Sequence, residues 1–241
     1  VFHETAVGIH DALTLLGITV ELKLLKKIAN PVYEDKALYI LIGATAVDKL
    51  PKRYSVVQME QTTATRWITD AYKETLRGAI SVWEFSEKNI AFWRSQDITT
   101  ACHHVPLRIP MCFATDDVAD RNVHRDIDVL FFGCRNPRRD RFFHHITHLL
   151  KPKGYNVVFS MDFDLFGDAR EALIARSKIV LNLHYYSEAV LETHRIEYLL
   201  AHGKCVVSEP STDKGLDAVY NGAIVFSAYE TLADTVLRLL Q

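Results

Sequence analysis

Titratable side chains follow two short apolar runs in the second half of this chain. His184 and Tyr185 come directly after the run at residues 178–183, and Glu209 follows the run at residues 205–207. Two such runs joined by a helix form a β-α-β unit, whose strands are parallel. Because ligands in open parallel sheets lie beyond the carboxyl ends of the strands, these three side chains are expected to line a binding site.

The segment between the two runs is expected to be helical and carries two carboxylates and an arginine. Its spacing predicts a helix over residues 188–202, which Gly203 ends. Glu188 and Glu192 would share one face of that helix, with Arg195 next to Glu192. The cluster suits a hydroxyl-rich, anionic ligand. An ordinary ion pair on a solvated helix face is the alternative.

A second cationic group lies in the sequence GCRNPRRDR at residues 133–141. Gly133 allows the backbone to come close to a ligand, and the N-terminus of the helix that follows attracts anions. Arg135, Arg138 and Arg139 add planar donors that match phosphate oxygens. Because arginines at this end of a helix oppose its dipole, we interpret the turn as a diphosphate cradle. Surface arginines without a ligand are the alternative.

The first half of the chain offers residues that could act as a general base. Glu60 and Glu84 follow apolar runs and would point from the end of a sheet, and His3 lies in the same half. A carboxylate or imidazole near an acceptor hydroxyl can take its proton. For each of these residues, a helix cap or a packed side chain is the alternative.

A metal site is not expected. Asp162 and Asp164 form a DxD sequence, but they lie in the middle of the second half, and with Asp168 they are better explained as a cap for the helix at residues 169–177. The three histidines at residues 144, 145 and 148 have helical ligand spacing without a carboxylate or cysteine motif beside them. No cofactor is predicted, because neither a P-loop nor a GxGxxG sequence is present.

Composition favours a cytoplasmic protein that does not bind nucleic acid and has no transmembrane segment. The chain has 241 residues, with 28 basic against 30 acidic side chains, and 49% of its residues are hydrophobic. It has no apolar run long enough to be a transmembrane segment and no signal peptide. Its four cysteines form no CxxC pair and are expected to be buried thiols in a reducing compartment. Because the chain opens on Val1 rather than Met, we expect other domains of a longer polypeptide.

Apolar runs and helical patterns alternate along the chain, which predicts an α/β fold. Strands are expected at residues 19–24, 37–42, 54–59, 79–83, 101–108, 128–132, 155–160, 178–183, 205–207 and 223–226. Helices are expected at residues 4–16, 65–76, 86–94, 138–150, 169–177, 188–202 and 228–240. Residues 114–126 lose the apolar rhythm and are interpreted as a linker. The prediction is therefore two Rossmann-like β/α domains facing a cleft, at residues 1–113 and 127–241.

Several phrases of the sequence resemble GT-B glycosyltransferases, in particular the group-1-type bacterial and viral branch. In the second half they are DVLFFGCRN (128–136), DAREALIARSKIVLNLHYY (168–186) and LETHRIEYLLAHGKCVVSE (191–209). In the first half they are KALYILIGA (36–44), YSVVQMEQ (54–61) and AISVWEFSEKNI (79–90). Many relatives carry two glutamates separated by seven residues before the GK turn, whereas here Glu188 and Glu197 are separated by eight. Glu192 is therefore the preferred carboxylate.

The resemblance implies a metal-independent glycosyltransferase of the hexosyl or deoxyhexosyl type. It would move a sugar from a nucleotide diphosphate sugar, with UDP-sugars favoured, to a glycan or other hydroxyl acceptor. The second domain would bind the nucleotide sugar, with Gly133 and Arg135 at the diphosphate. The first domain would bind the carbohydrate acceptor. The alternatives are a non-catalytic sugar-nucleotide or glycan-binding domain of a larger protein, and a GT-B-type sugar-nucleotide epimerase.

Overall fold

The protein is an α/β protein with two separate parallel sheets. The structure is a computed structural model that describes residues 2–24, 31–47, 49–63, 66–106, 123–161 and 165–241. The chain divides into two compact units, Val1–Arg108 and Ile109–Gln241, which we call unit 1 and unit 2. Most of the expected linker, residues 114–122, lies outside the described residues.

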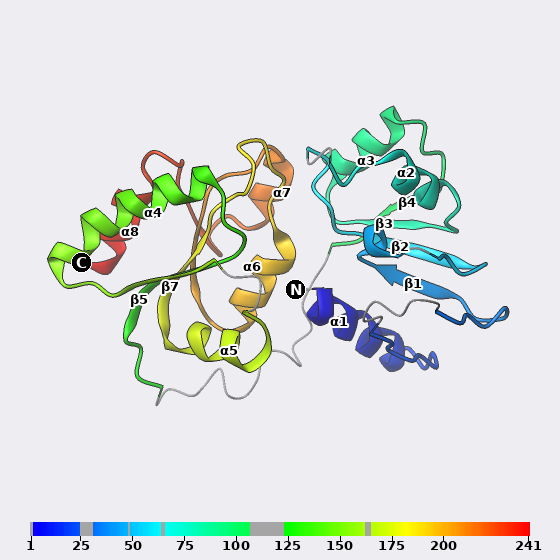
Figure 1. Ribbon diagram of the computed structural model, residues 1–241, viewed down its shortest axis with the longest axis horizontal. Coiled ribbons are helices and arrows are strands. Elements are labelled where there is room, and N and C mark those ends of the chain that lie inside the picture. Colours follow the sequence, from blue (N-terminus) through cyan, green and yellow to red (C-terminus); the bar gives the residue numbers. More distant parts are fainter. Residues whose placement is uncertain (1, 25–30, 48, 64–65, 107–122, 162–164) are drawn as a thin grey trace. The chain divides into compact units, whose positions relative to one another are not determined.

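Unit 1 contains a four-stranded sheet in the order β1-β2-β3-β4. Its elements are α1 (Phe2–Leu15), β1 (Tyr39–Ile42), the short 3-10 helix η1 (Ala44–Ala46), β2 (Tyr54–Gln58), α2 (Asp70–Arg77), β3 (Val82–Glu84), α3 (Glu87–Ser95) and β4 (Cys102–His104). Each strand pairs in parallel with the next. Because right-handed crossovers that all run in one direction place their helices on one face, α2 and α3 cover the same side of the sheet (Figure 1).

The core of unit 1 lies between its sheet and these two helices. Leu76 of α2 and Trp93 of α3 are fully buried against Val56 and Val82 of the central strands. Thr69 caps α2 and Ser86 caps α3 through side-chain oxygens that accept from backbone N–H groups. Both helices therefore begin at fixed points beyond the carboxyl ends of β2 and β3.

Unit 2 contains a five-stranded sheet in the order β6-β5-β7-β8-β9, and all of its strand pairs are parallel. Its elements are β5 (Ile127–Phe132), α4 (Pro137–Leu150), the 3-10 helix η4 (Lys151–Lys153), β6 (Val157–Ser160), α5 (Gly167–Arg176), β7 (Ser177–Asn182), α6 (Thr193–Ala201), β8 (Cys205–Ser208), α7 (Lys214–Val219), β9 (Val225–Phe226) and α8 (Leu232–Leu240). Seven of its helices and strands fall within two residues of the boundaries read from the sequence at both ends, namely β5, α4, β6, α5, β7, β8 and β9.

The sheet of unit 2 is buried on both faces, which explains its continuous apolar strands. Val129 and Phe131 of β5 pack on one face against α4 and α8, whereas Leu130 and Phe132 pack on the other against α5 and α6. Figure 1 shows the two layers of helices on either side of the sheet. Alternation along β5 thus contributes side chains to two cores, and the strand cannot shift by one residue without exchanging them.

Several expectations about local structure are wrong, and the helices expected from residues 65 and 228 begin later, at Asp70 and Leu232. Residues 19–24 form no strand, because they pair with no other segment in the described residues, and Leu22 and Leu24 are exposed. Residues 188–192 are not helical, and α6 begins at Thr193. The expected cap at Asp168 is also absent, since this residue lies inside the first turn of α5 and Phe166 occupies the N-cap position.

The cysteines also differ from expectation. Cys134 and Cys205 are exposed and Cys102 is half-buried, whereas Cys112 lies outside the described residues. Cys134 is in the turn after β5, and Cys205 begins β8 at the amino edge of the sheet. No pattern around these cysteines distinguishes an exposed thiol from a buried one.

Candidate functional site

The strand order of unit 2 reverses at β5. From β5 the chain passes to β6 on one side, and then returns to β7 on the other side of β5. The connections after β5 and β7 therefore diverge at the carboxyl ends of these two strands, which is where open α/β sheets bind ligands. Gly133 follows β5, and His184 lies two residues after β7.

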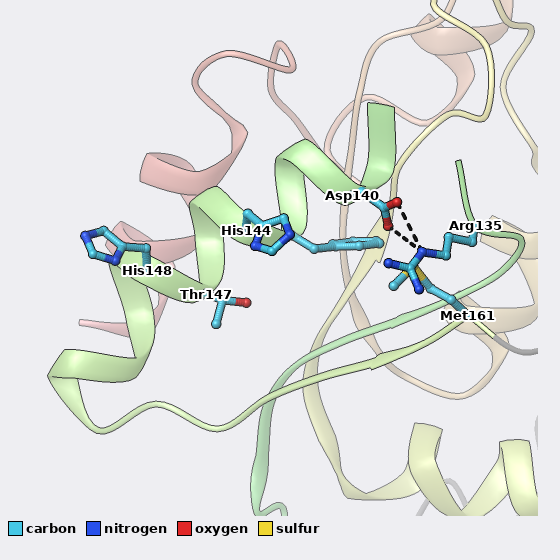
Figure 2. A pocket seen from close by; sticks show the side chains of 7 residues that line it. Arg135, Asp140, His144, Thr147, His148 and Met161 are labelled. Carbon is cyan, nitrogen blue, oxygen red and sulfur yellow. Dashed lines mark hydrogen bonds and ion pairs between the residues drawn. The ribbon is translucent and has the colours of Figure 1, made fainter. Parts of the chain in front are cut away.

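The three arginines of the turn after β5 lie in different environments. Arg135 is exposed, and its Nε donates to both carboxylate oxygens of Asp140, at 3.0 and 3.1 Å (Figure 2). Beside this pair lies an open groove of about 430 Å³, lined by Arg135, Asp140, Phe143, His144, Thr147, His148 and Met161. Arg135 therefore belongs to the outer surface of α4, at one end of this groove.

Arg138 is bound by an internal carboxylate. Its Nη1 donates to Oε1 of Glu209 at 2.8 Å, and its Nη2 donates to the other oxygen of the same group. The guanidinium also lies 4.1 Å from the ring centre of Tyr229. Glu209 is 4% exposed, and its Oε1 accepts the backbone N–H of His184 as well. Both residues thus tie the end of β8 to the start of α4 and to the residues after β7.

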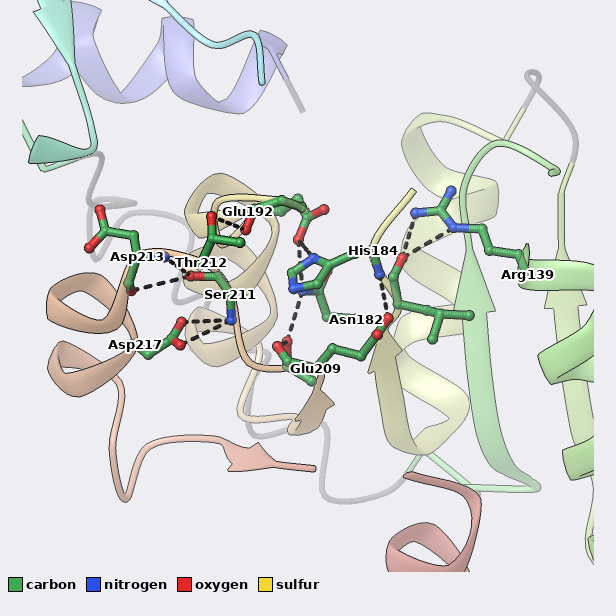
Figure 3. Close-up of polar contacts among 12 residues, drawn as sticks. Arg139, Asn182, His184, Glu192, Glu209, Ser211, Thr212, Asp213 and Asp217 are labelled. Atoms are coloured by element: carbon green, nitrogen blue, oxygen red, sulfur yellow. Dashed lines mark hydrogen bonds and ion pairs between the residues drawn. The ribbon is translucent and has the colours of Figure 1, made fainter. Parts of the chain in front are cut away.

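Arg139 is buried and bonds to backbone carbonyls. Its Nε donates to the carbonyl of Leu183 at 3.1 Å (Figure 3). Its Nη1 donates to the carbonyl of Cys134 at 2.7 Å. These arginines therefore do not need a bound anion to explain their place at the start of the helix, and the interpretation based on that need is wrong. Arg138 has an internal carboxylate and Arg139 has internal carbonyls, and these partners stabilise both against the helix dipole.

Gly133 brings Arg139 and Arg195 together. Its φ of 148° favours glycine, and a Cβ at this position would lie 3.2 Å from Nη2 of Arg195 and 3.4 Å from Nη1 of Arg139. Arg195 reaches this point from the first turn of α6, where its Nη1 donates to the carbonyl of Phe132 at 2.6 Å. Two guanidinium groups thus lie side by side at the carboxyl end of β5.

Burial lowers the pKa of both arginines, and the charge of Glu192 opposes this effect in each. Burial, followed by the charge of Arg195, lowers the pKa of Arg139 to about 10, while the charge of Glu192 raises it. Burial also lowers the pKa of Arg195, again against the charge of Glu192. Both guanidinium groups remain charged near neutral pH, and they share the same carboxylate.

His184 and Glu192 form a close ion pair beside the arginines. Nδ1 of His184 lies 2.7 Å from Oε2 of Glu192, which also accepts from Nδ2 of Asn182 at 2.9 Å (Figure 3). Burial lowers the pKa of His184, but the charge and hydrogen bond of Glu192 outweigh it, so the net shift is upward. Burial raises the pKa of Glu192, and the same pairing brings it down to about 2.

Two polar atoms of this cluster lack a protein partner. Nε2 of His184 and Oγ1 of Thr193 are buried and make no hydrogen bond with the described residues. Both bonds that Glu192 accepts from the described residues go to Oε2, which leaves Oε1 available as an acceptor. The cluster therefore retains unused hydrogen-bonding capacity at the edge of the sheet.

The charges of this cluster do not balance. Arg138 pairs with Glu209 and is also close to the charge of Glu230, and the charge of Glu209 acts on His184 as well. Glu192 is the carboxylate whose charge acts on both Arg139 and Arg195, and it also pairs with His184. An unbalanced, largely buried positive charge is costly without a counter-ion, so this arrangement favours an anion. We call Gly133, Arg139, His184, Glu192 and Arg195 the switch-point cluster.

Two other residues expected in this site have different positions. Glu188 is exposed in the segment before α6, where the buried residues Ala189, Val190 and Leu191 follow it. Three consecutive buried side chains do not fit one face of a helix, and Thr212 ties the carbonyl of Ala189 to the segment after β8. Tyr185 does lie beside the cluster, with its ring centre 5.3 Å from the guanidinium of Arg139.

Sequence reasoning missed two residues that position the cluster. Asn136 accepts the backbone N–H of Arg139 and donates to the carbonyl of Tyr185 at 2.7 Å, so it joins the start of α4 to the connection after β7. Asn182 ends β7 and holds both Glu192 and Ser208. Asn136 precedes Pro137, a common start of a helix, and this signal could have identified it as a cap.

The candidate bases of unit 1 differ in their access to a ligand. Glu60 is half-buried after the end of β2, and its Oε1 accepts from Oγ1 of Thr45 at 3.2 Å. Glu84 is the last residue of β3 and is fully buried, so its carboxylate offers no surface to a substrate. His3 is exposed on α1. Of the three, Glu60 alone combines partial exposure with a position at the carboxyl edge of the sheet.

The described residues contain no group of three or more histidine, cysteine, aspartate and glutamate side chains arranged to hold a metal. Asp162 and Asp164 fall outside those residues. In the same part of the chain, no helix combines the length and apolar character that crossing a membrane requires.

Comparison with known proteins finds relatives in one virus. The chain is 26% identical over 219 residues to an uncharacterized protein of Acanthamoeba polyphaga mimivirus, a match that covers 86% of this chain and 67% of the relative. A second uncharacterized protein of the same virus is 27% identical over 173 residues, covering 70% of this chain and 56% of the relative. In a third, 29% identical over 122 residues, the match covers 50% of this chain but 13% of the relative. No family model and no solved structure matches.

Proposed function

We propose that the protein is a metal-independent glycosyltransferase of the GT-B type that takes its sugar from a nucleotide diphosphate sugar, with UDP-sugars favoured. The observation that carries the proposal is the switch-point cluster. Arg139 and Arg195 lie together at Gly133, at the carboxyl ends of β5 and β7, and Glu192 is their shared carboxylate. A diphosphate supplies the missing negative charge at such a place.

The chemistry of glycosyl transfer suits this arrangement. The bond between the anomeric carbon and the diphosphate oxygen breaks with its electrons going to the diphosphate, while the sugar passes through an oxocarbenium-like state. Charge therefore grows on the leaving diphosphate, and fixed guanidinium groups stabilise it more in the transition state than in the ground state. Oε1 of Glu192, which accepts no bond from the described residues, can bind a hydroxyl of the ribose or of the sugar.

The open groove beside Arg135 offers room for the rest of the nucleotide. Arg135, which lines it, is two residues after Gly133 in the chain, and the groove's volume of about 430 Å³ falls within the range of small-molecule sites. His144 and Met161 line it with ring and thioether surfaces on which a flat base can rest. We propose that the nucleoside lies here and that the diphosphate lies at the cluster.

A panel of UDP-, GDP- and dTDP-sugars with hydroxyl acceptors tests the function. A transferase releases free nucleoside diphosphate and forms a glycosylated acceptor. Recovery of an isomerised donor would identify an epimerase, and donor binding without any turnover would identify a binding domain.

Addition of EDTA to the same assays tests the metal requirement. Because arginines supply the positive charge at the diphosphate, turnover is expected to persist. Loss of turnover that Mn²⁺ or Mg²⁺ restores would show that the aspartates at residues 162 and 164 matter instead.

A further inference from the structure

A buried carboxylate lies at the centre of the polar interior of unit 1. Glu84 is fully buried, and its oxygens accept from four donors: the backbone N–H of Phe85, and the side chains of Gln58, Asn89 and Trp93, at 2.9 to 3.1 Å. A carboxylate with four donors around it and no surface in water is not a proton-transfer group for a substrate. Its position requires another explanation.

Glu84 determines how two amides are oriented. Burial raises the pKa of Glu84 to about 7, although its four hydrogen bonds lower it, so the group is ionised above that pH. An ionised carboxylate only accepts hydrogen bonds, so both Gln58 and Asn89 must then present their NH₂ groups to it. Their carbonyl oxygens therefore point away from Glu84. Both amides are fully buried, which leaves neither free to turn over without losing a hydrogen bond.

The two oriented amides hold both ends of one short segment. Oε1 of Gln58 accepts the backbone N–H of Glu60 at 2.5 Å, and Nε2 donates to the carbonyl of the same residue at 2.9 Å. Oδ1 of Asn89 accepts from Oγ1 of Thr62 at 2.8 Å. The hydroxyl of Tyr72 occupies the remaining acceptor position of Gln58, so the amide has no bonding capacity left.

The segment that is held carries Glu60, the half-buried carboxylate at the carboxyl edge of β2. Burial raises the pKa of Glu60, while the hydrogen bond from Thr45 and the charge of Arg66 oppose this effect. A carboxylate in such a place is more basic than one in water, and it retains surface for a ligand.

We infer that Glu84 is a positioning residue that acts through Gln58 and Asn89 to fix residues 60–62, so that Glu60 accepts the proton of a substrate hydroxyl. The proton-accepting role rests on the proposed glycosyl transfer, whereas the positioning does not. In that step the acceptor oxygen bonds to the anomeric carbon, the diphosphate leaves with the electrons of the broken bond, and the hydroxyl proton passes to the Glu60 carboxylate.

The pKa of Glu60, measured by carbon-13 NMR of its side-chain carboxyl in the full chain, tests the positioning directly. Glu60→Gln identifies the signal. In Glu84→Gln, the new NH₂ group faces hydrogen-bond donors where the carboxylate offered an acceptor. The amides of Gln58 and Asn89 are then no longer held in one orientation, and residues 60–62 are expected to become exposed to water. The pKa of Glu60 is then expected to fall toward its ordinary value of about 4.3.

Two further variants keep the test decisive. Ile98→Ala creates a cavity in the core of unit 1 but removes no hydrogen bond of the network, and it is expected to leave the pKa of Glu60 unchanged. Thr62→Val removes only the hydrogen bond to Asn89, so it gives a smaller fall even if Glu84→Gln does not fold. All three tryptophans lie in unit 1, so their fluorescence reports whether each variant is folded there.

Turnover separates the two parts of the inference. If transfer is observed, Glu60→Gln should abolish it, and Glu84→Gln should lower kcat far more than it raises KM. If no transfer is observed, the proposed function fails while the NMR result still decides the positioning. An unchanged pKa of Glu60 in folded Glu84→Gln and Thr62→Val would overturn the inference.

Discussion

The pairing of His184 with Glu192 makes a side-chain contact with a definite pH dependence. The pKa of His184 is raised above 6.5, so its contribution to stability is complete below that pH and is lost as the pH rises through the folded-state value. The pKa of Glu192 is lowered from 4.5 to about 2, so its contribution is present above 4.5 and is lost as the pH falls toward 2. The pair therefore stabilises unit 2 most between these two limits.

Urea unfolding of His184→Gln and of the parent protein, followed by far-UV circular dichroism, tests this contact. As the pH rises above 6.5, the parent should lose the stability that this pair contributes, whereas the variant lacks that contribution and should lose less. Comparing the two removes the contribution of the other histidines. Equal losses in both proteins would show that the imidazole is not charged in the folded state.

Residue types at the ends of strands identified most of the cluster, but not the role of each member. Gly133, Arg139, His184, Glu192 and Arg195 were all expected at the site, and the structure brings them together. The sequence could not show that Glu209 and Glu84 are buried acceptors, because burial depends on which elements pack against each other. Nor could it show that Arg135 pairs with Asp140, since a local ion pair and a ligand use the same side chain.

Among the elements, α4 begins at a residue that also holds the neighbouring connection. The side chain of Asn136 accepts from the backbone of Arg139 and donates to the carbonyl of Tyr185. We expect Asn136→Ala to lower the free energy of unfolding by about 1–2 kcal/mol, because it removes both a helix cap and a hydrogen bond between connections.

Asn136→Asp provides a matched comparison for the cap. The carboxylate can still accept from Arg139, but it offers no donor to Tyr185, so the cap persists while the cross-connection is lost. Urea unfolding should therefore place this variant between the parent and Asn136→Ala. A stability equal to that of Asn136→Ala would mean that the cap contributes nothing.

Elements with a strong apolar pattern were predicted well, whereas those that depend on tertiary contacts were not. β5, β7 and β8 appear where their continuous apolar runs predict buried parallel strands. Residues 19–24 alternate as a strand would, but alternation alone supplies no neighbouring strand to bond with. The short helix α7 has too few residues to produce a periodic signal and was not expected.

For the whole molecule, the separate cores of the two units predict separate responses to core substitutions. Leu130 is fully buried in unit 2, in a cluster that contains no residue of unit 1. We expect Leu130→Ala to lower the stability of unit 2 by about 2–5 kcal/mol, the usual cost of a cavity of this size.

Tryptophan fluorescence and hydrogen exchange distinguish the two units in that experiment. Since all three tryptophans belong to unit 1, the fluorescence transition of Leu130→Ala should match that of the parent. Hydrogen exchange in β5 and β7 should increase. A fluorescence transition that shifts along with exchange in unit 2 would show that the units unfold together.

The central claim is that the switch-point cluster binds the diphosphate of a nucleotide sugar, and calorimetry with UDP, GDP, dTDP and inorganic pyrophosphate tests it most directly. Arg195→Gln removes a charged donor beside Gly133, and Arg77→Ala removes an exposed arginine of unit 1 that belongs neither to the cluster nor to the groove. The account predicts that the parent binds a nucleoside diphosphate, that folded Arg195→Gln binds it with a free energy weaker by about 1.5–3 kcal/mol, and that Arg77→Ala binds it as the parent does. A parent protein that binds none of these ligands, or a folded Arg195→Gln that binds as the parent does, would contradict it.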